Sequence, residues 1–301
     1  MSRPTIRQAL AAEQPLVTPL AHDALSVRLI AAAGFRAFTV GGSALLAARY
    51  GFPDIALIGL KDMTEGLRDI AAASDLPFIA DADDGYGDVK AVARTVWEYE
   101  TIGVGGMLFE DQQRDRKQQR ADKAGAVVDE AVIEAKLRTA LSVRRNPETF
   151  IIGRTDAYGA LGIDAALRRA DRFLKLGVDG VFIAGLKTPE DYERVGRELK
   201  GSVLLAAMFE GAGTPWLTPQ ELGRLGFRQI SYPVSVMFRA VNAIQSGLAE
   251  LRAHALGIRP MTPLTNAVEV RTILDNAVEL KKWRDVEATF GDNAPSSAEK
   301  K

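Results

Sequence analysis

The chain has 301 residues, of which 47% are hydrophobic and 26% are charged, so it is long enough for one large or two average globular domains. Its 38 Lys and Arg residues nearly balance its 39 Asp and Glu residues, which excludes a strong overall field for attracting nucleic acid or an anionic membrane. Cysteine is absent, which excludes disulfides, thiolate metal sites and a cysteine nucleophile. No signal-peptide core and no run of about 18 apolar residues is found, so we expect a cytoplasmic protein.

Eight short apolar runs follow one another along the chain, separated by stretches with helical periodicity. Between the third and fourth runs, for example, Val89, Val92 and Val96 recur at helical spacing, and Gly103 closes the segment. We expect each apolar run to form a strand. The runs occupy residues 15–21, 37–42, 76–82, 105–111, 150–156, 180–185, 203–209 and 229–233.

Strands that are apolar on both faces and alternate with helices are typical of a parallel sheet. Eight such units over about 250 residues match the (β/α)8 TIM barrel in number and length. An open doubly wound sheet is the alternative, and it is weaker because no G-x-G-x-x-G follows the first strand. We therefore predict an α/β fold, with a TIM-barrel catalytic domain in residues 1–255 and a C-terminal helical extension in 256–301 that ends in a disordered polar tail.

Acidic residues collect where the predicted strands end, and in a TIM barrel these ends share one mouth. Asp81 and Asp83 close the third run with their side chains on the same side, and Glu110 closes the fourth. Several carboxylates in one cavity repel one another unless a metal or basic groups offset their charge. Oxygen ligands without thiolates leave magnesium, manganese or calcium as candidates, and we favour magnesium because it needs few protein carboxylates. Asp84 and Asp88 are instead expected to be solvated turn formers.

Two further residues at the strand ends are candidates for a substrate site. Arg154 directly follows an apolar run, and we expect it to bind a substrate carboxylate in bidentate fashion. Glu210 stands in "EGAGTP", which fits a pocket and a plain loop equally well. The basic stretch 112–126 is either a disordered surface loop or a cationic lid that closes over an anionic substrate.

Seven motifs between about residues 15 and 250 resemble, in their order, the isocitrate lyase and phosphoenolpyruvate mutase superfamily. They read DALSVRLIAAAGF, GGSALLAARYGFPD, DADDGYG, FEDQ, GRTDA, EGAGTP and YPVS. The resemblance implies a barrel, a Mg²⁺ ion with Mn²⁺ as the alternative, and chemistry on small anionic 2-oxo or 2-hydroxy acids through a pyruvate enolate. It also implies site residues: Asp81 as the direct metal ligand, Asp83 and Glu110 on the metal or its waters, Asp54, Arg154 and Glu210 in catalysis, and Val40, Gly41, Gly42, Arg154 and Glu210 at the substrate.

Several positions depart from the lyases of this superfamily. Gln118 stands where their lid motif K-K-C-G-H has its cysteine, and Ala184, Ala207 and Val40 replace a glutamate, an asparagine and a serine of their pocket. Because glutamine cannot act as an acid or base, cleavage of isocitrate or 2-methylisocitrate is disfavoured. Decarboxylation of oxaloacetate needs only the metal and a proton from solvent, so we favour it. The alternatives are a mutase or hydrolase acting on a phosphonate, and a catalytically inactive protein that binds a carboxylate.

Apolar residues recur at helical spacing in residues 262–290, beyond the point where the barrel would have closed. Val270, Ile273, Leu274 and Trp283 belong to a stripe that needs another surface to cover it. The stripe could pack on its own barrel, but the resemblance implies exchange of a late helix between subunits. We therefore expect a homotetramer built from two helix-swapped dimers.

Overall fold

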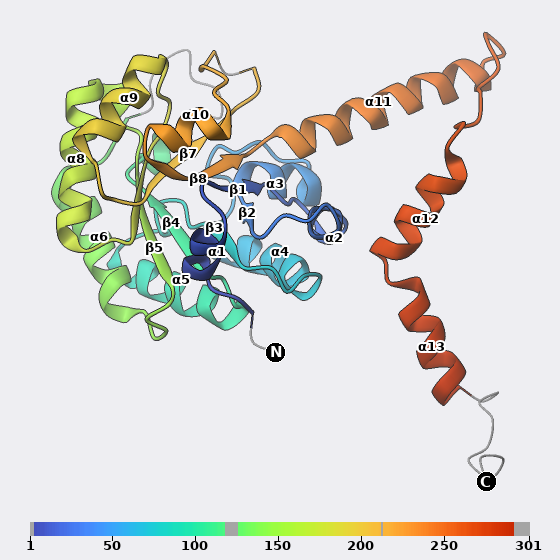
Figure 1. Ribbon diagram of the computed structural model, residues 1–301, viewed down its shortest axis with the longest axis horizontal. Coiled ribbons are helices and arrows are strands. Elements are labelled where there is room, and N and C mark those ends of the chain that lie inside the picture. The colour runs from blue at the N-terminus through green and yellow to red at the C-terminus, as the bar shows by residue number, and fades with distance from the viewer. Residues whose placement is uncertain (1–2, 118–125, 212, 292–301) are drawn as a thin grey trace. The chain divides into compact units, whose positions relative to one another are not determined.

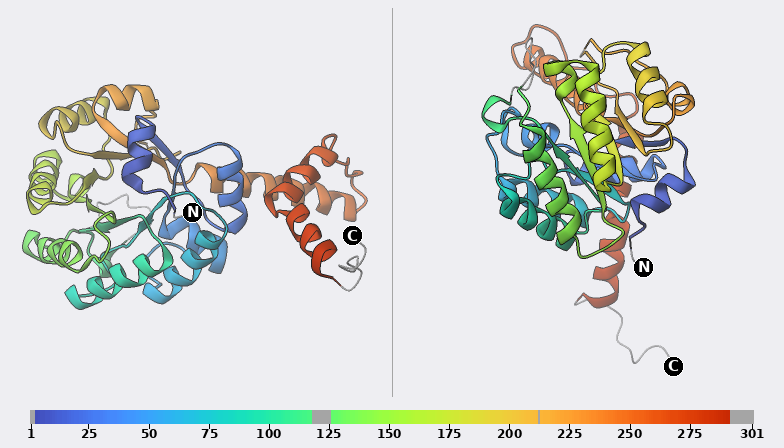
Figure 2. Two further views of the ribbon diagram at one scale, coloured as in Figure 1. Left: turned by 60° about the horizontal axis from the view of Figure 1, so that its bottom comes forward. Right: turned by 90° about the vertical axis from the view of Figure 1, so that its left-hand side faces the viewer.

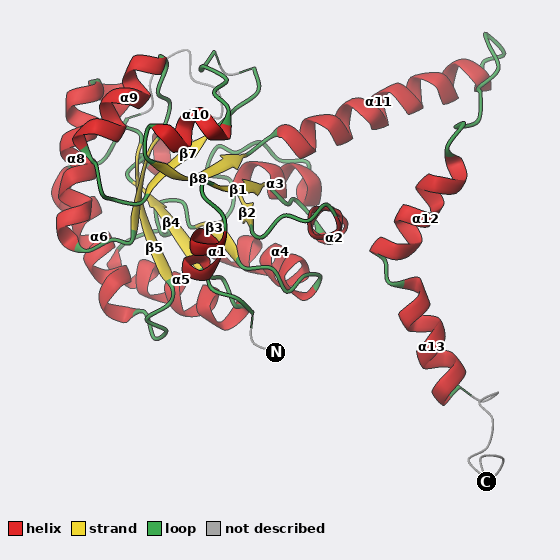
Figure 3. Ribbon diagram, viewed as in Figure 1, coloured by secondary structure: helices red, strands yellow, loops and turns green. Residues whose placement is uncertain are grey.

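The computed structural model describes residues 3–117, 126–211 and 213–291, and the chain divides into two compact units, Met1–Arg239 and Ala240–Lys301. In the described part of the first unit, eight parallel strands lie side by side in the order β1-β8-β7-β6-β5-β4-β3-β2. Figures 1 and 3 show these strands at the centre of the unit with helices around them. The strands are β1 (Leu16–Pro19), β2 (Phe38–Val40), β3 (Phe78–Asp81), β4 (Gly106–Glu110), β5 (Phe150–Thr155), β6 (Gly180–Ile183), β7 (Leu204–Ala207) and β8 (Phe227–Tyr232).

The sheet closes where its two end strands, β1 and β2, meet. A parallel bridge joins Leu20 to Thr39, and the N–H of Ala21 donates to the carbonyl of Thr39 at 2.9 Å. The hydroxyls of Thr18 and Thr39 form a further hydrogen bond of 2.9 Å across this seam. The closed sheet confirms the predicted (β/α)8 barrel, and every observed strand overlaps one of the predicted apolar runs.

Helices follow the strands as the βα rhythm predicts, and the left view of Figure 2 shows them ringing the barrel. Asp88 caps the first turn of α5, and Gly103 ends that helix with φ of 89°. No helix in residues 3–117, 126–211 or 213–291 is both long and apolar enough to cross a membrane. The helices that begin in the first unit are α1 (Ile6–Ala12), α2 (Ala24–Ala32), α3 (Gly42–Tyr50), α4 (Leu60–Ala72), α5 (Val89–Ile102), α6 (Glu130–Val143), α7 (Ala157–Leu161), α8 (Ile163–Leu176), α9 (Pro189–Glu198), α10 (Pro219–Arg224) and α11 (Ser235–Ala255).

Two packing features fix the geometry of the barrel. Helix α1 buries Ile6 and Leu10 in a core cluster that also contains Phe150, the first residue of β5, so α1 covers the end of the barrel opposite the mouth. On the outer face of β5, a Cβ at Gly153 would lie 2.7 Å from Phe173 of α8. The absent side chain therefore allows α8 to approach β5 closely, which matters for the site below.

The described part of the second unit contains the rest of α11 and two shorter helices, α12 (Ala267–Ala277) and α13 (Leu280–Phe290). The helical pattern predicted over residues 262–290 is therefore broken in two. The break lies at Glu279, whose φ of 53° is left-handed and cannot continue a right-handed helix. The division at residue 255 stays a prediction, and the predicted disordered tail lies outside the described residues beyond Gly291.

Candidate active site

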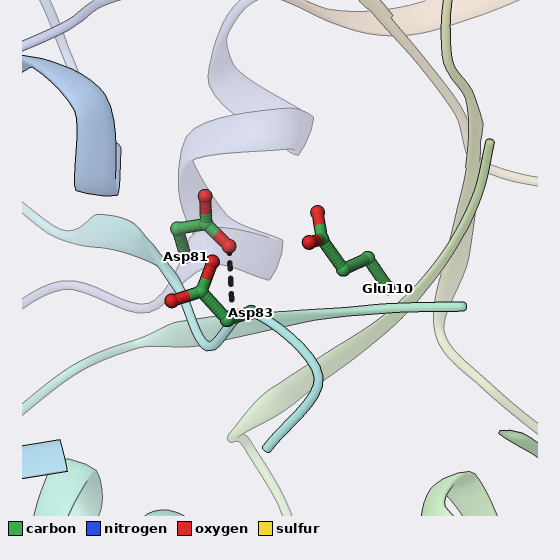
Figure 4. A group of neighbouring side chains, drawn as sticks. All are labelled: Asp81, Asp83 and Glu110. Atoms are coloured by element: carbon green, nitrogen blue, oxygen red, sulfur yellow. Dashed lines mark hydrogen bonds between the residues drawn. The ribbon is translucent and has the colours of Figure 1, made fainter. Parts of the chain in front are cut away.

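Three carboxylates meet at the mouth of the barrel, where β3 and β4 end side by side (Figure 4). Asp81 is the last residue of β3, and Glu110 is the last residue of β4. Asp83 has a left-handed backbone with φ of 47°, and its N–H donates to Asp81 Oδ1 at 2.9 Å. One oxygen from each carboxylate lies within 4.8 Å of the other two. The structure thus brings together the three residues that the sequence predicts as metal ligands.

Lys117 adds a positive charge to this cluster, a contact that the sequence did not predict. Its ammonium donates to Asp83, and it lies 3.2 Å from Asp54 Oδ1 and 3.3 Å from Glu110 Oε1. The side chain of Lys117 is only 8% exposed. Burial lowers the pKa of Lys117, but the neighbouring carboxylates outweigh burial and raise it, so the side chain stays charged. In the sequence, Lys117 is marked only by its position beside Gln118 in the basic stretch. The sequence spacing does not reveal its contact with Asp83, because the two residues are 34 positions apart.

The three carboxylates differ in how strongly they hold a proton. Burial raises the pKa of Asp81 to about 7, and the nearby charges of Asp83 and Glu110 add to the effect. Burial likewise raises the pKa of Asp83, although Lys117 opposes it. For Glu110, burial is outweighed by Arg154 and Lys117, and the pKa is lowered. The positive charges of Arg154 and Lys117 therefore offset the carboxylate of Glu110 more fully than that of Asp81.

The cluster fits a small divalent cation. Its donors are carboxylate oxygens, the ligands that Mg²⁺ prefers. Glu110 Oε2 is buried and has no hydrogen-bond partner in the part of the chain that the structure describes, although Arg154 Nη1 lies 2.9 Å away. The ion pair with Arg154 thus offsets the charge of this oxygen, and its lone pairs stay free of hydrogen bonds from the described residues.

Arg154, at the end of β5, lies between two acidic groups. Its Nε and Nη2 donate to the two oxygens of Asp156 at 2.8 and 2.9 Å, and its Nη1 lies 2.9 Å from Glu110. The guanidinium also lies over the ring of Phe182, 5.7 Å from its centroid. The Nε–Nη2 edge is therefore held by Asp156, and the outer Nη hydrogens remain for a ligand. The predicted contact with a substrate carboxylate stays a prediction.

A cavity of about 580 Å³ opens beside the carboxylates. Its lining includes the charged residues Asp54, Asp81, Lys117 and Arg154. It also includes the apolar residues Phe182, Ala207, Phe209, Val234 and Phe238. The cavity therefore offers charged groups for the carboxylates of a small acid and apolar surface for its remaining atoms.

The predicted substrate-binding residues differ in their relation to this cavity. Gly41 lines it as the N-cap of α3, so the first N–H groups of that helix lie at the cavity wall. Gly42 is the first residue of α3. Val40 packs fully buried in the core, which leaves only its backbone for a ligand. Glu210 lines the cavity and pairs with Arg239 Nη1 at 2.6 Å.

Asp84 forms a turn as the sequence predicts, since its Oδ1 accepts from the N–H of Tyr86 at 3.1 Å, but it is not solvated. It is 9% exposed, and its carboxylate lies 3.0 Å from the buried ammonium of Lys136 and 3.2 Å from Arg114 Nη1. Both partners lie far along the chain, so a local pattern of turn residues could not reveal them. Asp88, by contrast, is confirmed in an exposed turn, where it caps α5.

The basic stretch 112–126 is described only at its two ends. Gln112 and Val127 form an antiparallel bridge, and the N–H of Gln113 donates to Ala126 at 2.8 Å. Arg114–Arg116 forms a short 3₁₀ helix that leads into Lys117. Gln118 and the residues through 125 lie outside the described residues, so the choice between a lid and a plain surface loop stays open.

The sequence is similar to those of several known enzymes. Residues 6–252 match the family described as phosphoenolpyruvate phosphomutase. The chain is 36% identical over 252 residues to "Probable 2-methylisocitrate lyase 1" of Corynebacterium glutamicum, a match that covers 84% of this chain and 82% of that protein. It is 35% identical to the 2,3-dimethylmalate lyase of Eubacterium barkeri and 29% identical to the oxaloacetate decarboxylase of Bradyrhizobium sp., and both matches cover 95% of this chain and 96% of the relative.

Solved structures show the same likeness. An oxaloacetate acetylhydrolase in complex with the inhibitor 3,3-difluorooxalacetate superimposes with a TM-score of 0.87 at 28% identity, over 97% of both chains. A 2,3-dimethylmalate lyase superimposes with a TM-score of 0.85, also at 28% identity over 97% of both chains. The two superpositions include the barrel and the C-terminal helices, because they cover almost the whole chain.

Proposed function

The chain belongs to the phosphoenolpyruvate phosphomutase family, and from that premise we propose that it is a Mg²⁺-dependent carbon–carbon lyase of small 2-oxo or 2-hydroxy acids, with oxaloacetate decarboxylation favoured. The observation that carries the proposal is the buried group of Asp81, Asp83 and Glu110 beside Arg154, of which Asp81 and Arg154 also line the cavity. Such a group suits an anionic substrate only when a cation is also bound, because the carboxylates alone would repel the substrate.

The three carboxylates would contact the cation in different ways. Asp81 would bind Mg²⁺ directly, with Asp83 and Glu110 on the ion or on its waters. When bound, the ion supplies a Lewis acid that offsets the negative charge of a developing enolate. Mn²⁺ would serve the same oxygen ligands.

The protein groups around the cluster would orient the acid and stabilise charge. Arg154 presents its remaining N–H groups to the substrate carboxylate while Asp156 holds the guanidinium in place. The N–H groups at the start of α3, near Gly41 and Gly42, would donate to the oxygen on which charge develops. The electrons of the broken carbon–carbon bond enter the enolate, and a proton from solvent then completes pyruvate.

The apolar lining of the cavity favours loss of carbon dioxide. Ala184 and Ala207 stand where the related lyases are expected to carry polar side chains. Ala207 lines the cavity together with Phe182, Phe209 and Phe238, and Ala184 is buried in the core. A departing carboxylate facing this lining gives up a poorly solvated charge when it leaves as neutral carbon dioxide. The similarity to an oxaloacetate decarboxylase over 95% of the chain supports the same reaction.

A second candidate reaction is the cleavage of an alkyl-substituted malate to pyruvate and a smaller acid. The 35% identity to a 2,3-dimethylmalate lyase supports it, and so does the apolar lining, which would accommodate alkyl groups. Solved structures of a phosphoenolpyruvate phosphomutase and of phosphonopyruvate hydrolase are 21–25% identical to the chain, and a carboxyvinyl-carboxyphosphonate phosphorylmutase of Arabidopsis thaliana is 28% identical over 92% of it. Chemistry on a phosphonate and an inactive carboxylate-binding protein remain the alternatives.

Pyruvate release tests the proposal. Purified protein is incubated with Mg²⁺ and either oxaloacetate or 2,3-dimethylmalate, beside the Asp81→Ala and Asp88→Ala variants. We expect pyruvate from oxaloacetate at a rate about tenfold or more above that of the Asp81→Ala variant. The Asp88→Ala variant should retain the wild-type rate, because Asp88 only caps an exposed helix end. A wild-type rate equal to that of Asp81→Ala with both substrates would overturn the proposal.

A further inference from the structure

Arg154 is the last residue but one of β5, and Asp156 follows directly where the strand ends in a short turn, so their mutual geometry depends on what holds that turn. We infer that Asp111 and Arg169, two buried residues away from the cavity wall, are positioning residues that fix this turn and so orient Arg154 toward the substrate. The inference rests on the proposed function in one respect, namely that Arg154 binds the substrate carboxylate.

Asp111 contacts the turn at three consecutive residues. Its Oδ1 accepts from the N–H of Asp156 at 2.8 Å, and its Oδ2 accepts from the hydroxyl of Thr155 at 2.6 Å. Its own N–H donates to the carbonyl of Arg154 at 3.2 Å. The side chain is fully buried, so water does not compete for these hydrogen bonds. The side chain of Asp111 therefore holds Thr155 and Asp156 directly after Arg154, whose own backbone is paired with β4 and β6.

Arg169 pairs with Asp111 in this buried setting. Its Nη1 lies 2.9 Å from Asp111 Oδ2, and its side chain is only 6% exposed. The close approach of α8 to β5, where Phe173 packs on Gly153, brings Arg169 to this depth, because Arg169 lies one turn before Phe173 on the same helix face. A buried carboxylate without this partner would be strongly disfavoured.

An ion pair with only a structural role would connect helix α8 to the strands and would make no particular contacts with the residues of the active site. Here the hydrogen bonds of Asp111 beyond Arg169 run mainly to the turn that carries the substrate residues. From that turn, the chain of contacts continues through the Asp156 carboxylate to the Nε and Nη2 of Arg154, and from its Nη1 to Glu110. A buried pair on α8 and after β4 is thus connected to the metal cluster through Arg154.

The experiment compares Arg169→Met with Arg169→Lys and with Arg172→Met, a matched control on the same helix whose arginine pairs with Glu130 and Glu134 and is half exposed. The first readout is the affinity for oxalate, a planar dianion that imitates a pyruvate enolate, by calorimetry at saturating Mg²⁺. We expect Arg169→Met to weaken oxalate binding about 10- to 100-fold while Mg²⁺ affinity stays within about twofold of wild type. Arg169→Lys should recover part of the loss, and Arg172→Met should match wild type.

The second readout is the crystal structure of the Arg169→Met variant, which does not depend on any substrate. We expect residues 154–156 to shift and the Arg154–Asp156 pair to open. If Arg169→Met does not fold, the double variant Asp111→Asn with Arg169→Met removes both buried charges and keeps an isosteric amide, and it should fold with weakened oxalate binding. A folded variant with unchanged oxalate affinity and an unmoved turn would overturn the inference. Failure of the wild-type protein to bind oxalate would count against the proposed function alone, and the crystal structure would still decide the role of Arg169.

Discussion

Asp81 is the residue on which metal binding depends most directly. It ends β3, faces Asp83 and Glu110, and is the predicted direct ligand. We expect Asp81→Ala to abolish Mg²⁺ binding in calorimetric titration, because the ion would lose its direct carboxylate. Asp88→Ala, a loss of the same residue type seven positions later, should leave Mg²⁺ affinity unchanged and lower the free energy of unfolding slightly through loss of the helix cap. An unchanged Mg²⁺ affinity in Asp81→Ala would contradict the assignment.

The raised pKa of Asp81 predicts how metal binding depends on pH. Mg²⁺ binds the ionised carboxylate, so its affinity should rise about tenfold per pH unit up to about pH 7 and then level off. The stability of the metal-free protein should change with pH in the opposite direction. Because folding raises this pKa from 3.8 to about 7, the contribution of Asp81 to stability is full at low pH and is lost as the pH rises through about 7. Titrations and urea unfolding between about pH 5.5 and 8 test both trends, and a flat Mg²⁺ affinity would exclude Asp81 as the titrating ligand.

Lys117 and a metal ion would contact the same carboxylate oxygens. The ammonium already contacts Asp83 and lies 3.3 Å from Glu110. We expect Lys117→Met to bind Mg²⁺ more tightly than wild type, since a competing cation is removed, and to be less stable without metal, since the carboxylates lose their partner. Lys90→Met, at an exposed lysine, serves as the control. A weaker Mg²⁺ affinity in Lys117→Met would show that the lysine and the ion bind together.

At the scale of elements, the close packing of α8 on β5 supports the residues of the active site at the end of β5. A Cβ at Gly153 would approach Phe173 to 2.7 Å, so Gly153→Ala should force α8 outward and lower the free energy of unfolding by about 1–3 kcal/mol. Gly247→Ala, inside α11 with no atom within 4 Å of the new methyl group, should be neutral or stabilising by up to about 1 kcal/mol. Denaturant unfolding measures both changes. Equal stabilities of the two variants would mean that α8 adjusts freely.

The elements themselves were largely predictable from the sequence, because each is encoded locally. Apolar runs located the eight strands, and the helical spacing of Val89, Val92 and Val96 with Gly103 at its end located α5. The break at Glu279 was missed, because a left-handed glutamate has no signature in a pattern of apolar residues.

The contacts within the site were predictable only in part. The gathering of Asp81, Asp83 and Glu110 followed from the geometry of strand ends in a barrel. The burial of Asp84 by Lys136, and the approach of Lys117, join residues 52 and 34 positions apart on separate elements. Spacing along the chain does not encode such pairs.

For the whole molecule, the apolar side chains of the second unit bear on assembly. Ile273 and Leu274 of α12 and Trp283 of α13 are 47%, 43% and 61% exposed, as expected of a stripe that another subunit covers. We expect the full chain to form a homo-oligomer, and truncation before Thr262 to give monomers or insoluble protein. Light scattering of both proteins measures this. A monomeric full-length chain would contradict the prediction.

The seam between β1 and β2 bears on how a ligand enters the cavity. Three residues at or beside this seam, Leu20, Thr39 and Gly41, also line the cavity. Asp81 and Glu110 belong to β3 and β4, which are paired along their length. Because β2 also pairs with β3, the strand that ends at Asp81, only one strand separates the seam from the carboxylates. A local opening of the seam would widen the cavity beside Leu20, so entry of a ligand there and binding of the cation at β3 would be mechanically coupled through β2.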